Sequence, residues 1–247
     1  MDAAPPPRMR FRDILPKGLY WRTLLIIVAP AALLQLIITL VFLDDHWQAT
    51  SKRMSQGVAA DVALIIQLYE RNPTRENFEQ LRRRTKRICQ VLKPYGLRYG
   101  LEYVGPFTMR QGRPNPFIHN LDGLLELIAA VDEDNLGVLL DSYHWYTAGE
   151  DASDLARLSD DLVVVVHVND APAGVPRDEQ LDNVRGMPGE TGVIDIRTFL
   201  GALEKMGYTG PVMAEPFSER VRQLPPDEAV AATAESMNKI WQIAGLK

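Results

Sequence analysis

The sequence is poor in cysteine and has no excess of positive charge. Its 247 residues include a single cysteine, Cys89. One cysteine cannot form an intrachain disulfide or a Cys-rich zinc site. The 27 lysines and arginines stand against 32 aspartates and glutamates, which gives a net charge of −5. The chain therefore has no general attraction for nucleic acid, and we expect no nucleic-acid partner.

Charged side chains are absent from one long apolar run, residues 23–43 (TLLIIVAPAALLQLIITLVFL). A helix of that length covers a hydrocarbon core of about 30 Å. Basic residues precede the run and acidic residues follow it, so the positive-inside rule leaves the N-terminus in the cytoplasm. We predict a basic cytoplasmic segment over 1–22 and a transmembrane helix over 23–43, with the lipid bilayer as a partner. The predicted location is the inner (cytoplasmic) membrane, single-pass; the alternatives are a cleaved signal peptide, a buried core helix and, for the location, the cytoplasm.

Residues 44–84 keep a helical spacing of apolar side chains, and we expect a helical linker there. Residues 11–80, which include LPKGLYWRTLLIIVAPAALLQ, resemble the membrane anchor and first periplasmic helix of osmolarity-sensor histidine kinases. No phospho-acceptor histidine helix and no ATP-binding glycine motif follow, so no kinase activity is implied. Near the end of this part, Thr74 is placed to cap an amphipathic helix that stops before Pro94.

The rest of the chain alternates short apolar runs with amphipathic segments. The apolar runs are 98–104, 136–142, 162–168 and 211–217. Helical spacing marks 121–132, 153–159, 195–208 and 227–246. Near-continuous apolar strands that are each followed by a helix are typical of a parallel sheet covered by helices, so we predict an α/β fold.

Each apolar run carries one residue able to bind a metal at or near its C-terminal end. These residues are Glu102, Asp141, His167 and Glu215. The C-terminal ends of parallel strands lie at one edge, and in a (β/α) barrel that edge carries the active site. A mixed oxygen and nitrogen set suits one divalent ion, Mn²⁺, Mg²⁺, Co²⁺ or Zn²⁺. The alternative is a group of unrelated helix caps and a core histidine.

Five motifs carry a family resemblance between about residues 91 and 218. They are LEYVGP, LLDSYHWY, VHVNDAPAG, PGETGVIDI and GPVMAEPF. They resemble the sugar phosphate isomerase/epimerase group of the xylose isomerase-like TIM barrel superfamily. The resemblance implies a partial TIM barrel of about four βα units over 85–247, with one divalent metal bound by Glu102, Asp141, His167 and Glu215. It also implies that His144 contacts the substrate; the alternative is that His144 supports a metal ligand.

The resemblance implies a divalent-metal-dependent isomerase or epimerase acting on a small sugar, sugar phosphate or polyol. Such an enzyme moves a proton next to a carbonyl through an enediolate, with Glu102 and Glu215 as base and acid. We predict further substrate contacts from Asn169 and Arg185; a polar turn is the alternative for Asn169. Ketohexose epimerases carry a basic residue soon after the metal-binding histidine, where this chain has NDAPAG, so a keto-inositol or hydroxy-acid substrate stays open.

The family barrel has eight βα units, and this sequence supplies the last four. Two open sheet edges would need a partner, so we predict a homodimer that completes the barrel. The alternatives are a membrane-anchored sensor or binding protein without turnover, and an inactive fusion joined between about residues 72 and 92.

Overall fold

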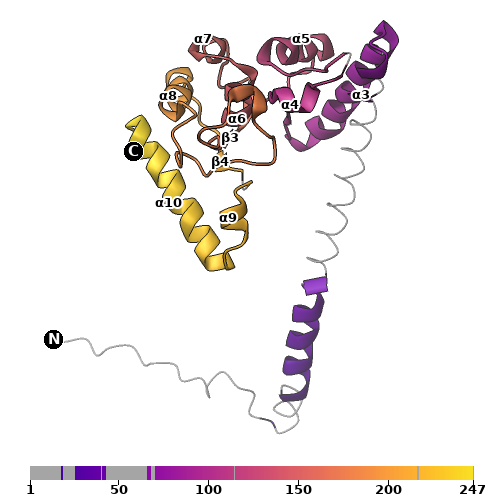
Figure 1. The fold of residues 1–247 in the computed structure, drawn as a ribbon. Coiled ribbons are helices and arrows are strands. Elements are labelled where there is room, and N and C mark those ends of the chain that lie inside the picture. The colour runs from indigo at the N-terminus through magenta and orange to yellow at the C-terminus, as the bar shows by residue number, and fades with distance from the viewer. Residues whose placement is uncertain are drawn as a thin grey trace, which may run out of the picture. The chain divides into compact units, whose positions relative to one another are not determined.

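The computed structural model describes residues 18, 26–39, 41–42, 66–67, 70–113, 115–215 and 217–246. The chain divides into two compact units, Met1–Asp61 and Val62–Lys247. Figure 1 shows the elements of each unit.

The first unit contains helical residues 26–39 and 41–42, whose apolar side chains are exposed. Within the described part of the chain, no helix is both long enough and apolar enough to cross a membrane. On that finding the predicted single-pass inner-membrane location is wrong. The predicted transmembrane helix over 23–43, part of which lies outside the described residues, and the bilayer as a partner are not supported. Most of the anchor resemblance over 11–80 and of the linker over 44–84 lies outside the described residues.

The second unit begins its regular structure with helix α3, Arg75–Leu92, followed by the short 3₁₀ helix η1, Lys93–Tyr95. Thr74 caps α3 as predicted, because its Oγ1 accepts a hydrogen bond from Asn77 N at 3.2 Å. The buried Leu81 and Cys89 of α3 pack against helix α5, Leu121–Val131. Figure 1 shows the two helices side by side.

Four strands form one parallel sheet in the order β1-β2-β3-β4. They are β1, Tyr99–Leu101; β2, Leu136–Asp141; β3, Val163–Val168; and β4, Val212–Ala214. The predicted α/β architecture with parallel strands is confirmed. Within the described residues, β1 and β4 each pair on one side only.

The remaining helices connect and cover the strands. They are α4, Phe107–Arg110; α6, Ser142–Ala148; α7, Ala152–Leu155; α8, Ile196–Met206; α9, Glu219–Arg222; α10, Pro226–Ala244; and the 3₁₀ helix η2, Arg177–Glu179. Side-chain caps fix two starts: Asn120 accepts from Gly123 N at the start of α5, and Asp195 accepts from Thr198 N at the start of α8. In Figure 1, α10 runs alongside α8.

The core lies between the sheet and its helices. Val138, Leu140, Val166 and Phe199 are completely buried there, and each such side chain contributes about 1.5–3 kcal/mol relative to exposure. Trp145 is also buried, with its ring centroid 5.6 Å from that of Phe199. The indole therefore packs within the core.

The opposite face of the sheet carries the predicted site residues. Register places Asp141 beside His167 and His167 beside Met213, so these side chains share one face. Leu139 and Val165 lie on the same face and are only half-buried, and Met213 is 45% exposed. Among the described residues, this apolar surface is incompletely covered.

Candidate functional site

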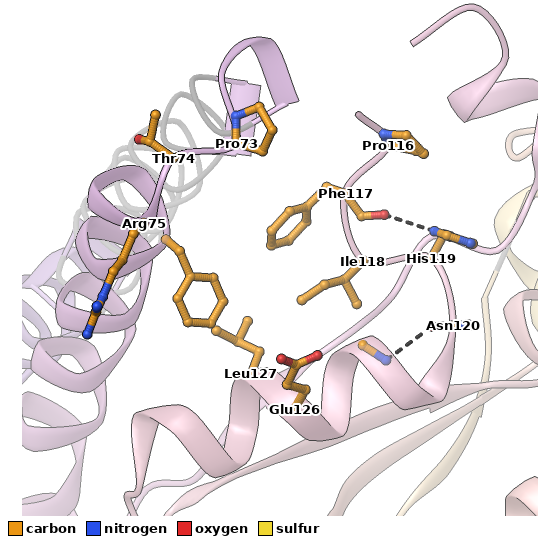
Figure 2. Close-up of a pocket in the computed structure, with 12 residues that line it drawn as sticks. Pro73, Thr74, Arg75, Pro116, Phe117, Ile118, His119, Asn120, Glu126 and Leu127 are labelled. Atoms are coloured by element: carbon orange, nitrogen blue, oxygen red, sulfur yellow. Dashed lines mark hydrogen bonds between the residues drawn. The ribbon is translucent and has the colours of Figure 1, made fainter. Parts of the chain in front are cut away.

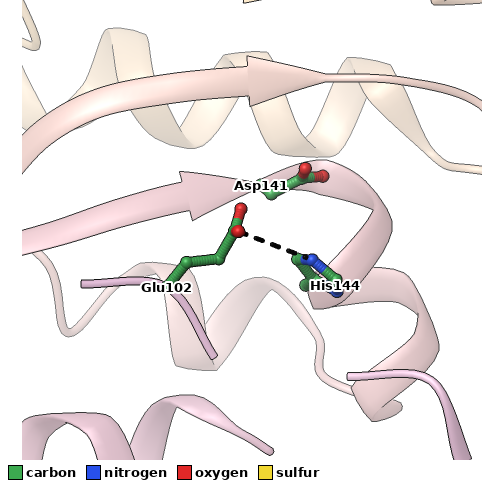
Figure 3. Close-up of side chains that lie close together, drawn as sticks. All are labelled: Glu102, Asp141 and His144. Atoms are coloured by element: carbon green, nitrogen blue, oxygen red, sulfur yellow. Dashed lines mark ion pairs between the residues drawn. The ribbon is translucent and has the colours of Figure 1, made fainter. Parts of the chain in front are cut away.

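The four predicted metal ligands converge where the strands end. Glu102 follows β1, Asp141 ends β2, His167 lies near the end of β3 and Glu215 follows β4. With His144, they form two overlapping groups, Glu102–Asp141–His144 and Asp141–His167–Glu215, in which one ligand atom of each residue lies within 4.8 Å of the others. Glu102 therefore groups with Asp141 and His144 and not with His167 and Glu215. Figure 3 shows the first group, with its three side chains pointing toward one another. Asp141 belongs to both groups, so it is the centre of the cluster.

Asp141 is held rigidly because it ends a strand and starts a helix. Its Oδ1 accepts a hydrogen bond from Tyr143 N at 2.6 Å, which makes it the N-cap of α6. The side chain is fully buried. Burial alone would raise the pKa of Asp141, but His144 and Arg185 outweigh it and hold that pKa below its usual value. The carboxylate is therefore a fixed negative charge.

His144 reaches the cluster from the first turn of α6. Gly105 N donates to its Nδ1 at 3.2 Å, which leaves the proton of the neutral ring on Nε2. Nε2 lies 3.8 Å from Glu102 Oε2 (Figure 3) and 3.8 Å from Asp182 Oδ1. Burial lowers the pKa of His144. Nε2 also lies 3.4 Å from Arg185 Nη2, so the ring is held beside the guanidinium and the two carboxylates.

Arg185 lies at the centre of the cluster and not at its margin. Its Nη1 donates to Asp141 Oδ2 at 2.8 Å and to Glu215 Oε2 at 2.6 Å. Its Nη2 donates to Asp182 Oδ1 at 2.9 Å. The guanidinium carbon stands 4.4 Å from the ring centroid of Tyr143, and the side chain is only 2% exposed. Arg185 is therefore a buried cation held by three carboxylates.

Asp170 positions the loop that delivers Arg185. Its backbone pairs with Gly186 in an antiparallel bridge. Its buried carboxylate accepts hydrogen bonds from the backbone N–H groups of Ala171, Thr191, Gly192 and Ile194. These hydrogen bonds hold the loop after β3 in place on both sides of Arg185.

Asn169 supports the same centre and is completely buried. The amide orientation that satisfies both of its ends donates to the backbone oxygen of Glu215 at 2.7 Å and accepts from Arg185 Nη1 at 3.1 Å. Asn169 thus holds the arginine and the end of β4 in place.

His167 provides the observation that tests whether a metal fits. Its buried Nδ1 has no hydrogen-bond partner among the described residues and lies 3.9 Å from Glu215 Oε1. A buried polar atom normally has a partner, and a ring nitrogen facing carboxylates is a suitable metal ligand. Together with Asp141 and Glu215, it forms an oxygen and nitrogen set that suits a divalent cation.

The electrostatics of the cluster also favour a cation. Four carboxylates, Glu102, Asp141, Asp182 and Glu215, surround the single guanidinium of Arg185. Burial, reinforced by the charges of Asp141 and Glu215, raises the pKa of Glu102 to about 8. Burial also raises the pKa of Glu215 to about 7, with Arg185 acting in the opposite direction. Negative charge is in excess here, and a bound cation would relieve it.

Two residues of the cluster were not predicted from the sequence. Asp182, three positions before Arg185, binds its guanidinium, and Phe217 lies 4.8 Å below the guanidinium carbon. Both come from irregular segments in which spacing carries no signal. Arg185 was predicted as a substrate contact, but the sequence offered no reason to place it between the metal ligands.

A separate hollow of about 390 Å³ lies between the start of α3, the loop before α5 and α5 itself. Figure 2 shows Phe117 and Ile118 of the loop on one side and Leu127 on the other. His119 and Glu126 line it, but His119 Nδ1 is within 3.0 Å of the backbone oxygen of Phe117. No group of three metal-competent residues gathers there among the described residues, so we assign the chemistry to the strand ends.

Several known proteins resemble this chain in sequence. An inosose isomerase from Halalkalibacterium halodurans is 29% identical over 152 residues, which are 60% of this chain and 50% of that protein. A 3-dehydroshikimate dehydratase from Pseudomonas aeruginosa is 30% identical over 131 residues, 53% of this chain and 19% of that protein. A 2-oxo-tetronate isomerase from Haemophilus influenzae is 29% identical over 157 residues, 63% of this chain and 54% of that protein. The chain spans about half the length of the two isomerases.

Solved structures share the fold. A xylose isomerase domain protein from Alicyclobacillus acidocaldarius is 36% identical with a TM-score of 0.59, over 69% of this chain and 60% of that one. The IOLI protein with a bound zinc atom is 23% identical with a TM-score of 0.57, over 66% of this chain and 57% of that one. The family described as xylose isomerase-like TIM barrel matches residues 48–240, which is most of the sequence. With its parallel strands and its polar cluster at their C-terminal ends, the chain belongs to the xylose isomerase-like TIM barrel family.

Proposed function

We propose that this chain carries the catalytic centre of a divalent-metal-dependent isomerase or epimerase for a small sugar, sugar phosphate or polyol. The reaction moves a proton next to a carbonyl through an enediolate. The observation that carries the proposal is the pair of overlapping groups, Glu102–Asp141–His144 and Asp141–His167–Glu215. The relatives named inosose isomerase and 2-oxo-tetronate isomerase support the reaction class.

The residues proposed to hold the metal are Glu102, Asp141, His167 and Glu215. Zinc in the IOLI structure supports a metal in this fold, and the orphaned nitrogen of His167 supports it in this chain. When bound, a divalent ion supplies positive charge that stabilises negative charge developing on substrate oxygens. Mn²⁺, Mg²⁺, Co²⁺ and Zn²⁺ all suit these ligands.

Glu102 and Glu215 are the proposed base and acid. In the metal-free chain, burial raises the pKa of Glu102 to about 8 and that of Glu215 to about 7, and a bound cation would lower both toward the range in which a carboxylate can accept a proton. The two residues follow the first and last strands of the sheet, so they stand on either side of the centre. One removes the proton from carbon and the other returns it.

His144, Asn169 and Arg185 are the proposed substrate contacts. The neutral Nε2–H of His144 is aimed into the site and would donate to a substrate oxygen. The buried amide of Asn169 and the guanidinium of Arg185 add further polar groups at the same place. Neutral donors and one cation are suited to hydroxyl and carbonyl oxygens.

A second copy of the chain is the proposed partner that completes the barrel. The half-buried Leu139 and Val165 and the exposed Met213 face the side where a closed barrel has its packed interior. In a two-fold arrangement about the barrel axis, β4 of one copy would pair in parallel with β1 of the other.

Solvent-proton exchange tests the function. In D₂O, the metal-loaded protein should incorporate deuterium into keto-inositols or ketoses at the carbon next to the carbonyl. Glu215→Gln keeps the shape but cannot carry the proton, so its exchange should fall by about 100-fold or more. Asp195→Asn, which alters only an exposed helix cap, is the matched control. No exchange by the metal-loaded parent chain would contradict the proposed function.

A further inference from the structure

Arg185 takes the place between two of the proposed metal ligands. One atom, Nη1, donates both to Asp141 Oδ2 at 2.8 Å and to Glu215 Oε2 at 2.6 Å. The side chains of Arg185 and Asp141 are almost completely buried, so water screens these contacts weakly. Among the described residues, the guanidinium is the only cation paired with both carboxylates.

The rest of the guanidinium is anchored elsewhere. Nε donates to the backbone oxygen of Asp182 at 2.7 Å, and Nη2 donates to Asp182 Oδ1 at 2.9 Å. The guanidinium carbon stands 4.4 Å from the ring centroid of Tyr143 and 4.8 Å from that of Phe217. Two of its three nitrogens therefore have a partner, Asp182, that is not one of the proposed metal ligands.

A divalent ion and this arginine compete for the same charges. Asp141, His167 and Glu215 come within 4.8 Å of one another, so an ion between them would stand a few ångströms from Nη1. Two positive charges that close repel strongly in a buried site. If Arg185 were absent and no ion were bound, the negative charges of Asp141 and Glu215 would have no cation beside them. Unpaired buried charges destabilise the folded protein.

We propose that Arg185 is a built-in counter-cation that occupies the metal-free centre and sets the metal affinity. It compensates Asp141 and Glu215 when no ion is bound. Because the guanidinium is planar and rigid, it would shift as one unit on metal binding, so that Nη1 leaves the two carboxylates while the Asp182 side chain follows Nη2. The inference rests on the proposed metal site. It gives Arg185 two effects: the arginine weakens metal binding, and it stabilises the folded protein when no metal is bound.

Metal affinity in Arg185 variants tests this. Arg185→Gln should bind Mn²⁺ about tenfold or more tightly than the parent chain in isothermal titration, because the competing charge is gone. Arg185→Lys keeps the charge and should stay near the parent value. Arg157→Gln removes an arginine from the exposed pair with Asp122 and should leave the affinity unchanged. Metal-free Arg185→Gln should melt lower than the parent chain and gain more in Tm when Mn²⁺ is added.

The titration separates the counter-cation role of Arg185 from the metal site itself. If Arg185→Gln binds Mn²⁺ no more tightly than the parent chain, the counter-cation role is refuted and the metal site survives. If neither chain binds, both the metal site and the inference are refuted. A second measurement needs no variant and therefore applies even if Arg185→Gln does not fold. In the ¹⁵N-labelled parent chain, Zn²⁺ titration should shift the Nη resonances of Arg185. Unchanged Nη resonances in the Zn²⁺-bound protein would refute the displacement.

Discussion

Replacing Asp141 with asparagine should destabilise the protein through one lost ion pair. Asparagine caps a helix as well as aspartate does, so the hydrogen bond from Tyr143 N to the capping oxygen is kept. What is lost is the charge that Arg185 Nη1 contacts at 2.8 Å in a fully buried setting. The change therefore isolates the electrostatic contribution from the cap.

The size of the effect follows from the partners that remain. Removing one member of a buried ion pair costs about 3–5 kcal/mol, but Arg185 keeps Glu215 and Asp182, so we expect about 2–3 kcal/mol. Because the folded-state pKa of Asp141 is lowered, its contribution is present above the unfolded-state pKa and is lost as the pH falls through the folded-state value. The difference between parent and variant should therefore shrink in acid.

Urea unfolding of the metal-free protein at pH 7 measures this. The control is Asp195→Asn, which changes the cap of α8 in the same chemical way without a buried ion pair, and it should stay within about 0.5 kcal/mol of the parent. Equal stabilities for Asp141→Asn and Asp195→Asn would refute the reasoning that a buried Arg185 ion pair holds the centre together.

Three further predictions concern pH, thiol chemistry and packing. The raised pKa of Glu102, about 8, means that the folded metal-free chain binds a proton that the unfolded chain loses, so stability should fall as the pH rises from about 4.5 to 8. Glu102→Gln should flatten that slope in urea titrations, and an unchanged slope would contradict the raised pKa. Burial raises the pKa of Cys89 to about 11, so its thiol should react with a disulfide reagent at pH 8 only after unfolding, and fast reaction of the native protein would be contrary. A methyl group at Gly105 would lie 2.3 Å from the backbone oxygen of His144, so Gly105→Ala should lower the stability by about 1–3 kcal/mol and disturb the site; a Tm equal to that of the parent would count against the packing described.

The sheet and its polar edge were predictable because they follow from strong local rules. Four apolar runs with polar ends required parallel strands, and parallel strands place Glu102, Asp141, His167 and Glu215 at one edge. The structure groups Asp141, His167 and Glu215 together, and it groups Glu102 with Asp141 and His144. The start of α5 at Asn120 and that of α8 at Asp195 follow equally local capping chemistry.

Other features depend on contacts between distant parts of the chain. Arg185 reaches Asp141 across 44 positions of sequence, from a loop that has no periodicity. Asp182 enters the site for the same reason, and no local pattern marks it. For the apolar run over 23–43, a strong local pattern was misleading. Its composition predicts a membrane span, but no described helix there is long enough and apolar enough to cross a membrane.

Anomalous diffraction from crystals grown with Mn²⁺ tests the central claim most directly. We predict one anomalous peak per chain, roughly 2.0–2.6 Å from carboxylate oxygens of Asp141 and Glu215 and from a ring nitrogen of His167, with Arg185 Nη1 turned away. Absence of a peak at the strand ends, with Arg185 still bound to Asp141 and Glu215 at saturating Mn²⁺, would contradict the account.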